Sequence, residues 1–488
     1  MKGAVAGAAT AAVAGALSES LPAGAASSAS SLSPYSSLGT LRTADVVVVG
    51  AGISGLYAAW LLRKAGHSVV IVEARDRLGG RILSASVGHG QLVEMGAEFV
   101  GADDPRLRKL VKELKLPLYD TYADGDVVLE IGGQTTTANN LSSNGALLGS
   151  AAATLAAAGT LQDMANTIPI DNPAATPDAA AWDQQTLQSW MAVNVPDPNA
   201  QSLITVAVQG LYGGTPSDAS LLHTLFSAQV HGGIAATGAI QGGSQQNRIV
   251  GTTKGIVDAL GAHLKGDVLL NAPVRVIDQS GSKVVVATDR GTVKGNAVIV
   301  AIPPTLAGRI QYAPQLPGNR DQFTQRMPMG YAMKVQAVYP EPFWREKGLS
   351  GMALSDGQPV SLSFDNSPNG AKATQGVLLG FIFADSGRTW GHKPEAQRRA
   401  AVLQQFTAWF GSQAANPTMY LEQNWTAEPW TRGYVGYMPT DVWVPYGDVV
   451  RAPVDRIHWA GSETGQEGMG AMEGGLQAAE RVVSEITS

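Results

Sequence analysis

The chain has 488 residues, enough for two or three domains, and its 44% hydrophobic and 15% charged residues are typical of a globular protein. A net charge of −6 without a long basic run gives no electrostatic footprint for nucleic acid. Cysteine is absent, which excludes disulfides, thiolate metal sites, cysteine nucleophiles and a cofactor attached through cysteine sulfur.

Residues 1–43 differ in composition from the rest of the chain. A basic start at Lys2, an uncharged Ala- and Gly-rich run to Leu17 and a small-residue site at Ala23-Gly24-Ala25 are typical of an export signal. They predict a periplasmic or extracellular protein, with a signal similar to the twin-arginine type except that the arginine pair is missing. A disordered extension of a cytoplasmic protein is the alternative. No stretch of strongly apolar residues is long enough to predict a membrane span.

The most informative feature is the glycine turn from Gly50 to Gly55, which lies between a valine-rich strand and an expected helix over 53–65. Gly50 permits a tight turn, Gly52 lets a pyrophosphate approach the backbone, and Gly55 brings the helix close to the strand. The helix N-terminus offers N–H groups and a positive dipole end to phosphates. A second strand over 68–73 ends at Glu73, which can accept hydrogen bonds from both ribose hydroxyls. This pattern predicts a dinucleotide-binding unit, with an ordinary glycine-rich turn as the alternative.

Hydrophobic periodicity predicts the remaining elements. The segment 139–181 has the spacing of helices, and 120–246 as a whole is expected to be mostly helical. Other expected helices are 107–114, 221–230, 256–264, 395–410 and 470–486. Expected strands are 92–100 with a break at Gly96, 268–270, 274–277, 283–287, 297–301, 334–339, 377–383 and a strand with a glycine turn over 457–464.

Further motifs follow the glycine turn in a fixed order, and together they resemble the flavin-containing monoamine oxidase family over residues 45–486. These motifs are the run from Glu73 to Arg81, Ala301 to Pro304, Glu341 to Trp344, Pro453 to Ile457, Ala460 to Thr464, and Met472 to Gly474.

The resemblance implies an α/β fold with a discontinuous, Rossmann-like FAD-binding domain and an inserted α+β substrate-binding domain. We expect the FAD-binding domain to comprise 44–119, 247–325 and 432–488, and the substrate-binding domain to comprise 120–246 and 326–431.

The resemblance also implies FAD in an extended pose, with Ser54, Glu73 and Arg81 at the pyrophosphate and ribose, and Val274 at the adenine. Because the family's cysteinyl-flavin position is Gly433, the FAD is expected to be noncovalent. A helix start near Gly470 would stabilise the reduced, anionic ring. The expected cofactor-binding residues are Gly50, Gly52, Ser54, Gly55, Glu73, Arg75, Gly80, Arg81, Gly96, Ala97, Glu98, Phe99, Val274, Trp425, Gly461, Glu463, Thr464, Ala471 and Met472. Trp430 is expected to pack near the flavin, and no metal is expected.

Lys334 and Tyr434 are the expected catalytic residues. In the family, a lysine at the position of Lys334 reaches flavin N5 through a water and assists the reaction with oxygen. A solvent-facing strand lysine and a structural ion pair are the alternatives. Tyr434 matches one of two tyrosines that form an aromatic cage for the amine, and Ala471 stands at the position of the other.

The resemblance places Phe99, Leu362, Phe364, Phe381, Tyr434 and Ala471 along the substrate cavity, where ordinary core packing is the alternative for each aromatic residue. The missing second tyrosine and the phenylalanine walls favour a bulky apolar or cyclic amine. Glu98 would favour a polyamine if it anchored a second ammonium. The alternative is that Glu98 faces outward or pairs with an arginine.

The expected function is FAD-dependent oxidation of a neutral amine. A hydride passes from the α-carbon to flavin N5, the imine hydrolyses to an aldehyde or ketone, and O2 reoxidises the flavin to give H2O2. The alternatives are an amine dehydrogenase that uses an electron-carrier protein, an L-amino-acid oxidase, an NAD(P)-dependent dehydrogenase and a non-catalytic flavin-binding protein. The expected partners are a small-molecule amine and O2, and a homodimer is possible.

Overall fold

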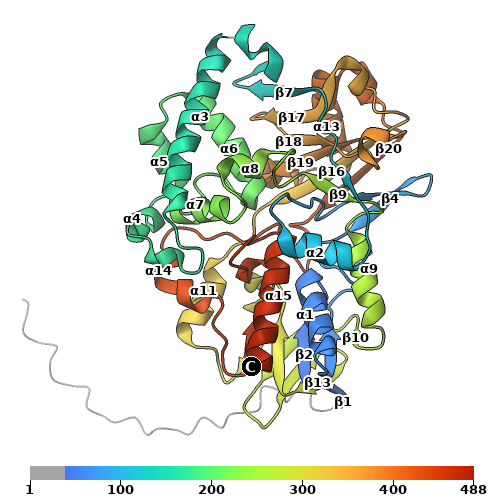
Figure 1. The fold of residues 1–488 in the computed structure, drawn as a ribbon, viewed down its shortest axis with the longest axis vertical. Coiled ribbons are helices and arrows are strands. Elements are labelled where there is room, and N and C mark those ends of the chain that lie inside the picture. The colour runs from blue at the N-terminus through green and yellow to red at the C-terminus, as the bar shows by residue number, and fades with distance from the viewer. Residues whose placement is uncertain (1–38, 144) are drawn as a thin grey trace, which may run out of the picture.

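The computed structural model describes residues 39–143 and 145–488, which form an α/β structure with three large sheets (Figure 1). The export-signal interpretation rests on residues outside this described part. None of its helices is both long and apolar enough to cross a membrane.

The first sheet is parallel and combines strands from three distant parts of the chain. In spatial order the strands are β10 (Val268–Leu269), β3 (Val69–Val72), β2 (Val46–Val49), β14 (Ala297–Val300) and β21 (Ile457–Trp459). β2 and β3 are fully buried and rich in β-branched residues, as expected for central strands of a covered parallel sheet. The discontinuity expected for the dinucleotide-binding domain is therefore present in this sheet.

Four helices pack around one face of the parallel sheet: α1 (Ile53–Lys64), α2 (Pro105–Glu113), α9 (Lys254–His263) and α15 (Met472–Thr487). α1 and α15 lie side by side next to β2 (Figure 1). Leu56 and Leu62 of α1 share a buried core with Leu476 and Val482 of α15.

The opposite face is covered by a mixed sheet in the order β1 (Thr40–Thr43), β13 (Gly291–Gly295), β12 (Val284–Thr288), β11 (Val274–Asp278) and β15 (Gln311–Ala313). β1 corrects one expectation, namely that residues 40–43 belong to a signal-like or disordered segment. They pair in parallel with β13 instead. The sequence does not predict this strand because it is short and exposed, has no alternation of apolar and polar residues, and depends on pairing with its partner strand.

The third sheet has seven strands in the order β20 (Met419–Asn424), β16 (Ala332–Tyr339), β19 (Gly376–Phe383), β18 (Leu362–Asp365), β17 (Leu349–Ser355), β7 (Asp126–Ile131) and β8 (Gln134–Thr137). Helix α13 (Glu395–Phe410) packs on it through Val402 and Phe406, against Met333 and Val335. α13 has the expected bounds. β7 and β8 were missed, since the 120–246 segment was expected to be mostly helical.

A helical layer lies beside the seven-stranded sheet (Figure 1). Its buried core includes Trp190, Tyr212, Phe226, Phe323 and Trp443. The layer comprises α3 (Gly145–Asn166), α4 (Ala179–Asp183), α5 (Leu187–Asn194), α6 (Pro198–Tyr212), α7 (Leu221–Gln229), α8 (Ile234–Gly238), α11 (Gly318–Arg326) and α14 (Trp443–Tyr446).

Short elements connect these layers. They are β4 (Ser84–Gly88), β5 (Gln91–Glu94), β6 (Leu118–Asp120), β9 (Asn247–Ile249), α10 (Pro304–Ala307) and α12 (Ala384–Trp390). The mixed α/β fold class is confirmed, while the domain boundaries given above stay predictions.

The glycine turn has the close approach that its sequence predicts. A Cβ at Gly55 would lie 2.1 Å from the carbonyl oxygen of Gly50, and Gly50 itself has φ of 100°. By contrast, a Cβ at Gly159 in α3 would meet nothing within 4 Å.

We expect Gly55→Ala to lower the free energy of unfolding by about 1–3 kcal/mol or more, because backbone must move to admit the methyl group. Gly159→Ala is the matched control, and its helix propensity should raise the same quantity by up to about 1 kcal/mol. Thermal unfolding of the two variants checks this. A Gly55→Ala variant as stable as the wild type would contradict the close helix–strand packing.

Candidate functional site

One cavity of about 370 Å³ lies where the parallel sheet, the N-termini of α1 and α15, and the seven-stranded sheet meet. We call it the central cavity. Gly50, Glu73, Ala301 and Gly461 line it, and each lies just beyond the carboxyl end of a parallel strand. This edge of an open α/β sheet is where ligands bind in such folds.

The central cavity brings together most residues expected at the site. Those that line it are Gly50, Gly52, Ser54, Glu73, Arg75, Gly80, Arg81, Gly96, Ala97, Glu98, Phe99, Lys334, Leu362, Phe364, Phe381, Trp425, Trp430, Tyr434, Gly461, Ala471 and Met472. The expected residues outside the lining are Gly55, Val274, Glu463 and Thr464.

The end of the cavity at Gly52 is a backbone cradle. Gly52 is the N-cap of α1, no side chain caps this helix start, and a Cβ at Gly52 would meet nothing within 4 Å. The first turn of α1 lines the cavity through Gly52, Ile53 and Ser54, together with Gly80. The start of α15 at Met472 also lines the cavity and likewise lacks a side-chain cap. Two helix N-termini suit an anionic, phosphate-bearing ligand, so the residues fit a dinucleotide.

Glu73 is buried at the end of β3 and has its carboxylate fixed by the neighbouring backbone. Its two oxygens accept hydrogen bonds from the N–H groups of Ala51, at 2.7 Å, and Arg75, at 2.9 Å. The remaining lone pairs of the carboxylate can accept hydrogen bonds from ribose hydroxyls. The Ser54 hydroxyl accepts the N–H of Gly461 at 3.0 Å, which ties α1 to the turn after β21.

Arg81 is held by Glu463, which lies behind the cavity wall. The Arg81 guanidinium donates to Glu463 Oε2 at 2.8 Å, to Ser462 Oγ at 2.9 Å and to the Tyr434 carbonyl at 2.8 Å. Burial alone would raise the pKa of Glu463, but the charge and hydrogen bonds of Arg81 outweigh it and hold that pKa below its usual range. Glu463 thus acts through Arg81 and does not itself face the cavity.

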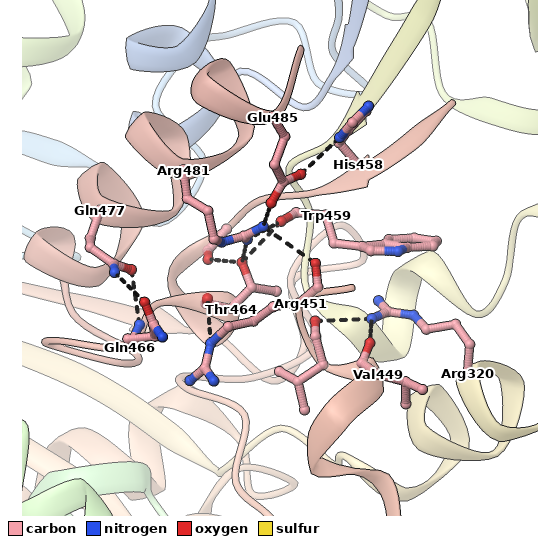
Figure 2. Close-up of polar contacts among 12 residues, drawn as sticks. Arg320, Val449, Arg451, His458, Trp459, Thr464, Gln466, Gln477, Arg481 and Glu485 are labelled. Atoms are coloured by element: carbon pink, nitrogen blue, oxygen red, sulfur yellow. Dashed lines mark hydrogen bonds and ion pairs between the residues drawn. The ribbon is translucent and has the colours of Figure 1, made fainter. Parts of the chain in front are cut away.

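The turn after β21 is also supported from behind by arginines that sequence reasoning missed (Figure 2). Arg481 donates to the Trp459 carbonyl at 2.6 Å and to Thr464 Oγ1 at 3.3 Å, and Arg451 donates to the Thr464 carbonyl at 3.3 Å. The guanidinium of Arg320 lies 3.7 Å from the Trp459 ring centroid. Burial, followed by the charge of Arg481, lowers the pKa of Arg451 to about 10, which leaves it charged at neutral pH. Thr464 therefore belongs to the support of the turn.

At the other end of the cavity, Lys334 is 3% exposed, so the interpretation as a solvent-facing lysine is wrong. Its Nζ donates to the Gly96 carbonyl at 2.9 Å and forms an ion pair with Glu98. The other carboxylate oxygen of Glu98 pairs with Arg248 Nε at 3.0 Å, and Arg248 donates to Glu94 at 2.6 Å. We call Glu94, Arg248, Glu98 and Lys334 the charge network. Glu98 is arginine-paired, as one of the two alternatives stated, although its Oε1 accepts no hydrogen bond from the described part of the protein.

Three side chains hold three consecutive carbonyls in the segment that reaches the cavity wall at Gly96. Gln336 donates to the Glu94 carbonyl at 3.0 Å, Trp425 to that of Met95 at 2.9 Å, and Lys334 to that of Gly96. A Cβ at Gly96 would lie 1.9 Å from the Arg81 carbonyl oxygen. This segment is consequently fixed on both sides.

Aromatic rings form a continuous row along the same end of the cavity. The ring centroids of successive pairs lie 5.0–6.3 Å apart, and we call this set the aromatic row. Its members in order are Phe99, Phe364, Phe381, Phe383 and Tyr434. Burial raises the pKa of Tyr434, so its phenol stays neutral. Phe383 was missed, although its position two residues after Phe381 in β19 puts both on one face of the strand.

His231 and Gln245 also line the cavity and were not expected. His231 Nδ1 lies 2.6 Å from the Ser227 carbonyl, to which it donates, and burial lowers its pKa. It is therefore a neutral polar group. In the described part of the chain, no group of three or more His, Asp or Glu side chains is placed to hold a metal.

We expect Glu463→Gln to lower the free energy of unfolding at pH 7 by about 1–3 kcal/mol, because Arg81 loses its counterion. The unperturbed pKa of a glutamate is 4.5, and that of Glu463 is lower in the folded protein. Its charge therefore stabilises the fold fully above pH 4.5, and this stabilisation is lost as the pH falls through the lower pKa of the folded state. The difference in Tm between wild type and variant should therefore narrow below that pH. A constant difference across the range would contradict the ion pair.

Known proteins are similar to this chain in both sequence and fold. Residues 53–487 match the family described as "Flavin containing amine oxidoreductase". A probable flavin-containing monoamine oxidase A of Dictyostelium discoideum is 36% identical over 91% of this chain and 97% of its own. An L-amino acid dehydrogenase of Synechocystis is 33% identical over 93% and 97%.

Solved structures agree with these relatives. Putrescine oxidase bound to putrescine superposes with a TM-score of 0.86 at 30% identity, covering 92% of this chain and 99% of that one. Cyclohexylamine oxidase from Brevibacterium oxydans gives 0.84 at 30% identity, covering 91% and 98%. The chain therefore belongs to the flavin-containing amine oxidoreductase family.

Proposed function

We propose that this protein is an amine oxidase that binds FAD noncovalently and oxidises a monoamine with a bulky apolar group, using O2 as the electron acceptor. The main support for a monoamine substrate is the position and pairing of Glu98. Its carboxylate lies beside the aromatic row but already forms ion pairs with Lys334 and Arg248.

The family membership supports a flavin, and the extent of the central cavity supports FAD. The cavity runs from Glu73 and the backbone cradle of Gly52 to the aromatic row, which matches a ligand with a dinucleotide end and a flat ring. With no cysteine in the sequence, no thioether to the flavin can form. At Gly433, the position that carries cysteinyl flavin in relatives, φ is +156° and a Cβ would lie 2.4 Å from Met329 Cβ.

The charges of the cavity favour a monoamine. A diamine such as putrescine needs an anion for its second ammonium, and the Glu98 carboxylate beside the aromatic row is already in ion pairs with Lys334 and Arg248. An amino acid needs a cation for its carboxylate, but Lys334 is paired with Glu98 and Arg81 with Glu463. An apolar amine requires neither group, so it is the class that these walls accommodate.

Bound FAD would supply a two-electron acceptor between the amine C–H bond and O2, with the overall balance that amine and O2 give imine and H2O2. The imine and water then give a carbonyl compound and ammonia. The protein's own contribution is to position and desolvate the substrate, and the aromatic row binds its apolar group. The Tyr434 phenol is neutral, so it adds no negative charge that would favour the protonated form of the amine. Lys334 places an ammonium at the wall beside Gly96.

The purified protein, loaded with FAD, should produce peroxide with cyclohexylamine and benzylamine in an assay coupled to peroxidase. We expect kcat/KM for putrescine and for L-leucine to be lower by about tenfold or more, because the second charge of each finds no partner. Catalase should abolish the signal. Putrescine as the best substrate would overturn the monoamine assignment, and electron transfer to dyes without peroxide formation would indicate a dehydrogenase.

Ala471 leaves room in the cavity wall where a tyrosine would narrow it. We expect Ala471→Tyr to lower kcat/KM for cyclohexylamine by about tenfold while changing that for propylamine much less. The visible spectrum of the bound flavin serves as the control for an intact cofactor site. Equal losses for both amines would show that Ala471 does not set the width of the cavity.

A further inference from the structure

The charge network joins the cavity wall to groups buried behind it. Lys334 and Glu98 line the central cavity, whereas Arg248 and Glu94 do not. All four side chains are at most 3% exposed, and their formal charges alternate along the row and sum to zero. Buried charges of this kind persist only when each has a partner.

The network is closed by backbone as well as by side chains. Lys334 and Gln336 lie two residues apart on β16, and they hold the carbonyls of Gly96 and Glu94, respectively. Arg248 lies opposite Tyr119 in the β6–β9 pair, with its guanidinium 5.3 Å from that ring. Burial lowers the pKa of Arg248, but the two glutamates outweigh it and raise that pKa, so the guanidinium stays charged.

We propose that Glu98 and Arg248 are positioning residues for the flavin reaction, which fix the Lys334 ammonium at the cavity wall and set the electrostatic potential there. This inference rests on the proposed function, because it requires a bound flavin, and it further assumes that the flavin ring lies at the Gly96–Phe99 wall. The network orders its charges so that the ammonium is at the cavity and the carboxylate of Glu94 is remote from it. In a buried site, such charges act over short distances with little screening.

A change of one charge should then shift the reduction potential of bound FAD, because the reduced ring gains negative charge. Glu98→Gln removes a negative charge, and we expect it to raise the equilibrium constant for two-electron reduction at least tenfold, about 30 mV. Arg248→Met removes a positive charge and should lower the constant by a similar factor. The double variant restores the balance of charge and should return to within about threefold of the wild type. The potential is measured by anaerobic equilibration with a reference dye.

Two controls separate this effect from a loss of packing. Arg248→Lys keeps the charge and should keep the potential near that of the wild type. Asp258→Asn makes the same change in net charge as Glu98→Gln, but at an exposed ion pair with Lys254, and should not shift the potential. If Arg248→Met does not fold, Lys334→Met replaces it in both the single and the double variant, with the same expected directions.

The proposal is overturned if Glu98→Gln and Arg248→Met shift the potential in the same direction, or if neither shifts it. It is also overturned if the double variant lies further from the wild type than either single variant. A wild-type protein that binds no FAD, or whose FAD no amine reduces, would contradict the proposed function instead. The two failures are therefore distinguishable.

Discussion

The structure depends on buried glutamates whose charges are balanced by partners from distant parts of the chain. Glu463 pairs with Arg81, 382 residues earlier, and Glu98 pairs with Lys334, 236 residues later. A buried carboxylate without a partner is strongly unfavourable, so each of these pairs requires its segments to come together. The N-terminal unit, the seven-stranded sheet and the C-terminal turn are thereby joined at one cavity.

The same pairings decide what the cavity can bind. Because Glu98, Arg81 and Lys334 are occupied within the protein, they offer little to a charged substituent of a substrate. The cavity also presents the aromatic row at one end and the uncapped N-termini of α1 and α15 at the other. The first suits an apolar amine and the second an anionic dinucleotide.

Sequence reasoning succeeded where local pattern carries the information. The glycine turn, α1, α13 and α15 follow from close backbone approach and from helical periodicity. It failed for β7 and β8, which precede the Ala- and Ser-rich run beginning at residue 139, and for β1, which depends on its partner strand. The ion pairs of Arg248 with Glu94 and Glu98, and the arginines that support the 459–465 turn, were also missed. Their partners are remote carboxylates and backbone carbonyls, which leave no motif in the sequence.

The most direct measurement is an anaerobic titration of the purified, FAD-loaded protein with cyclohexylamine, followed by absorbance of the flavin. The account predicts full bleaching of the oxidised band and its return when O2 is admitted, with one H2O2 per flavin. A flavin that stays oxidised in excess amine, or a protein that cannot be loaded with FAD, would contradict it.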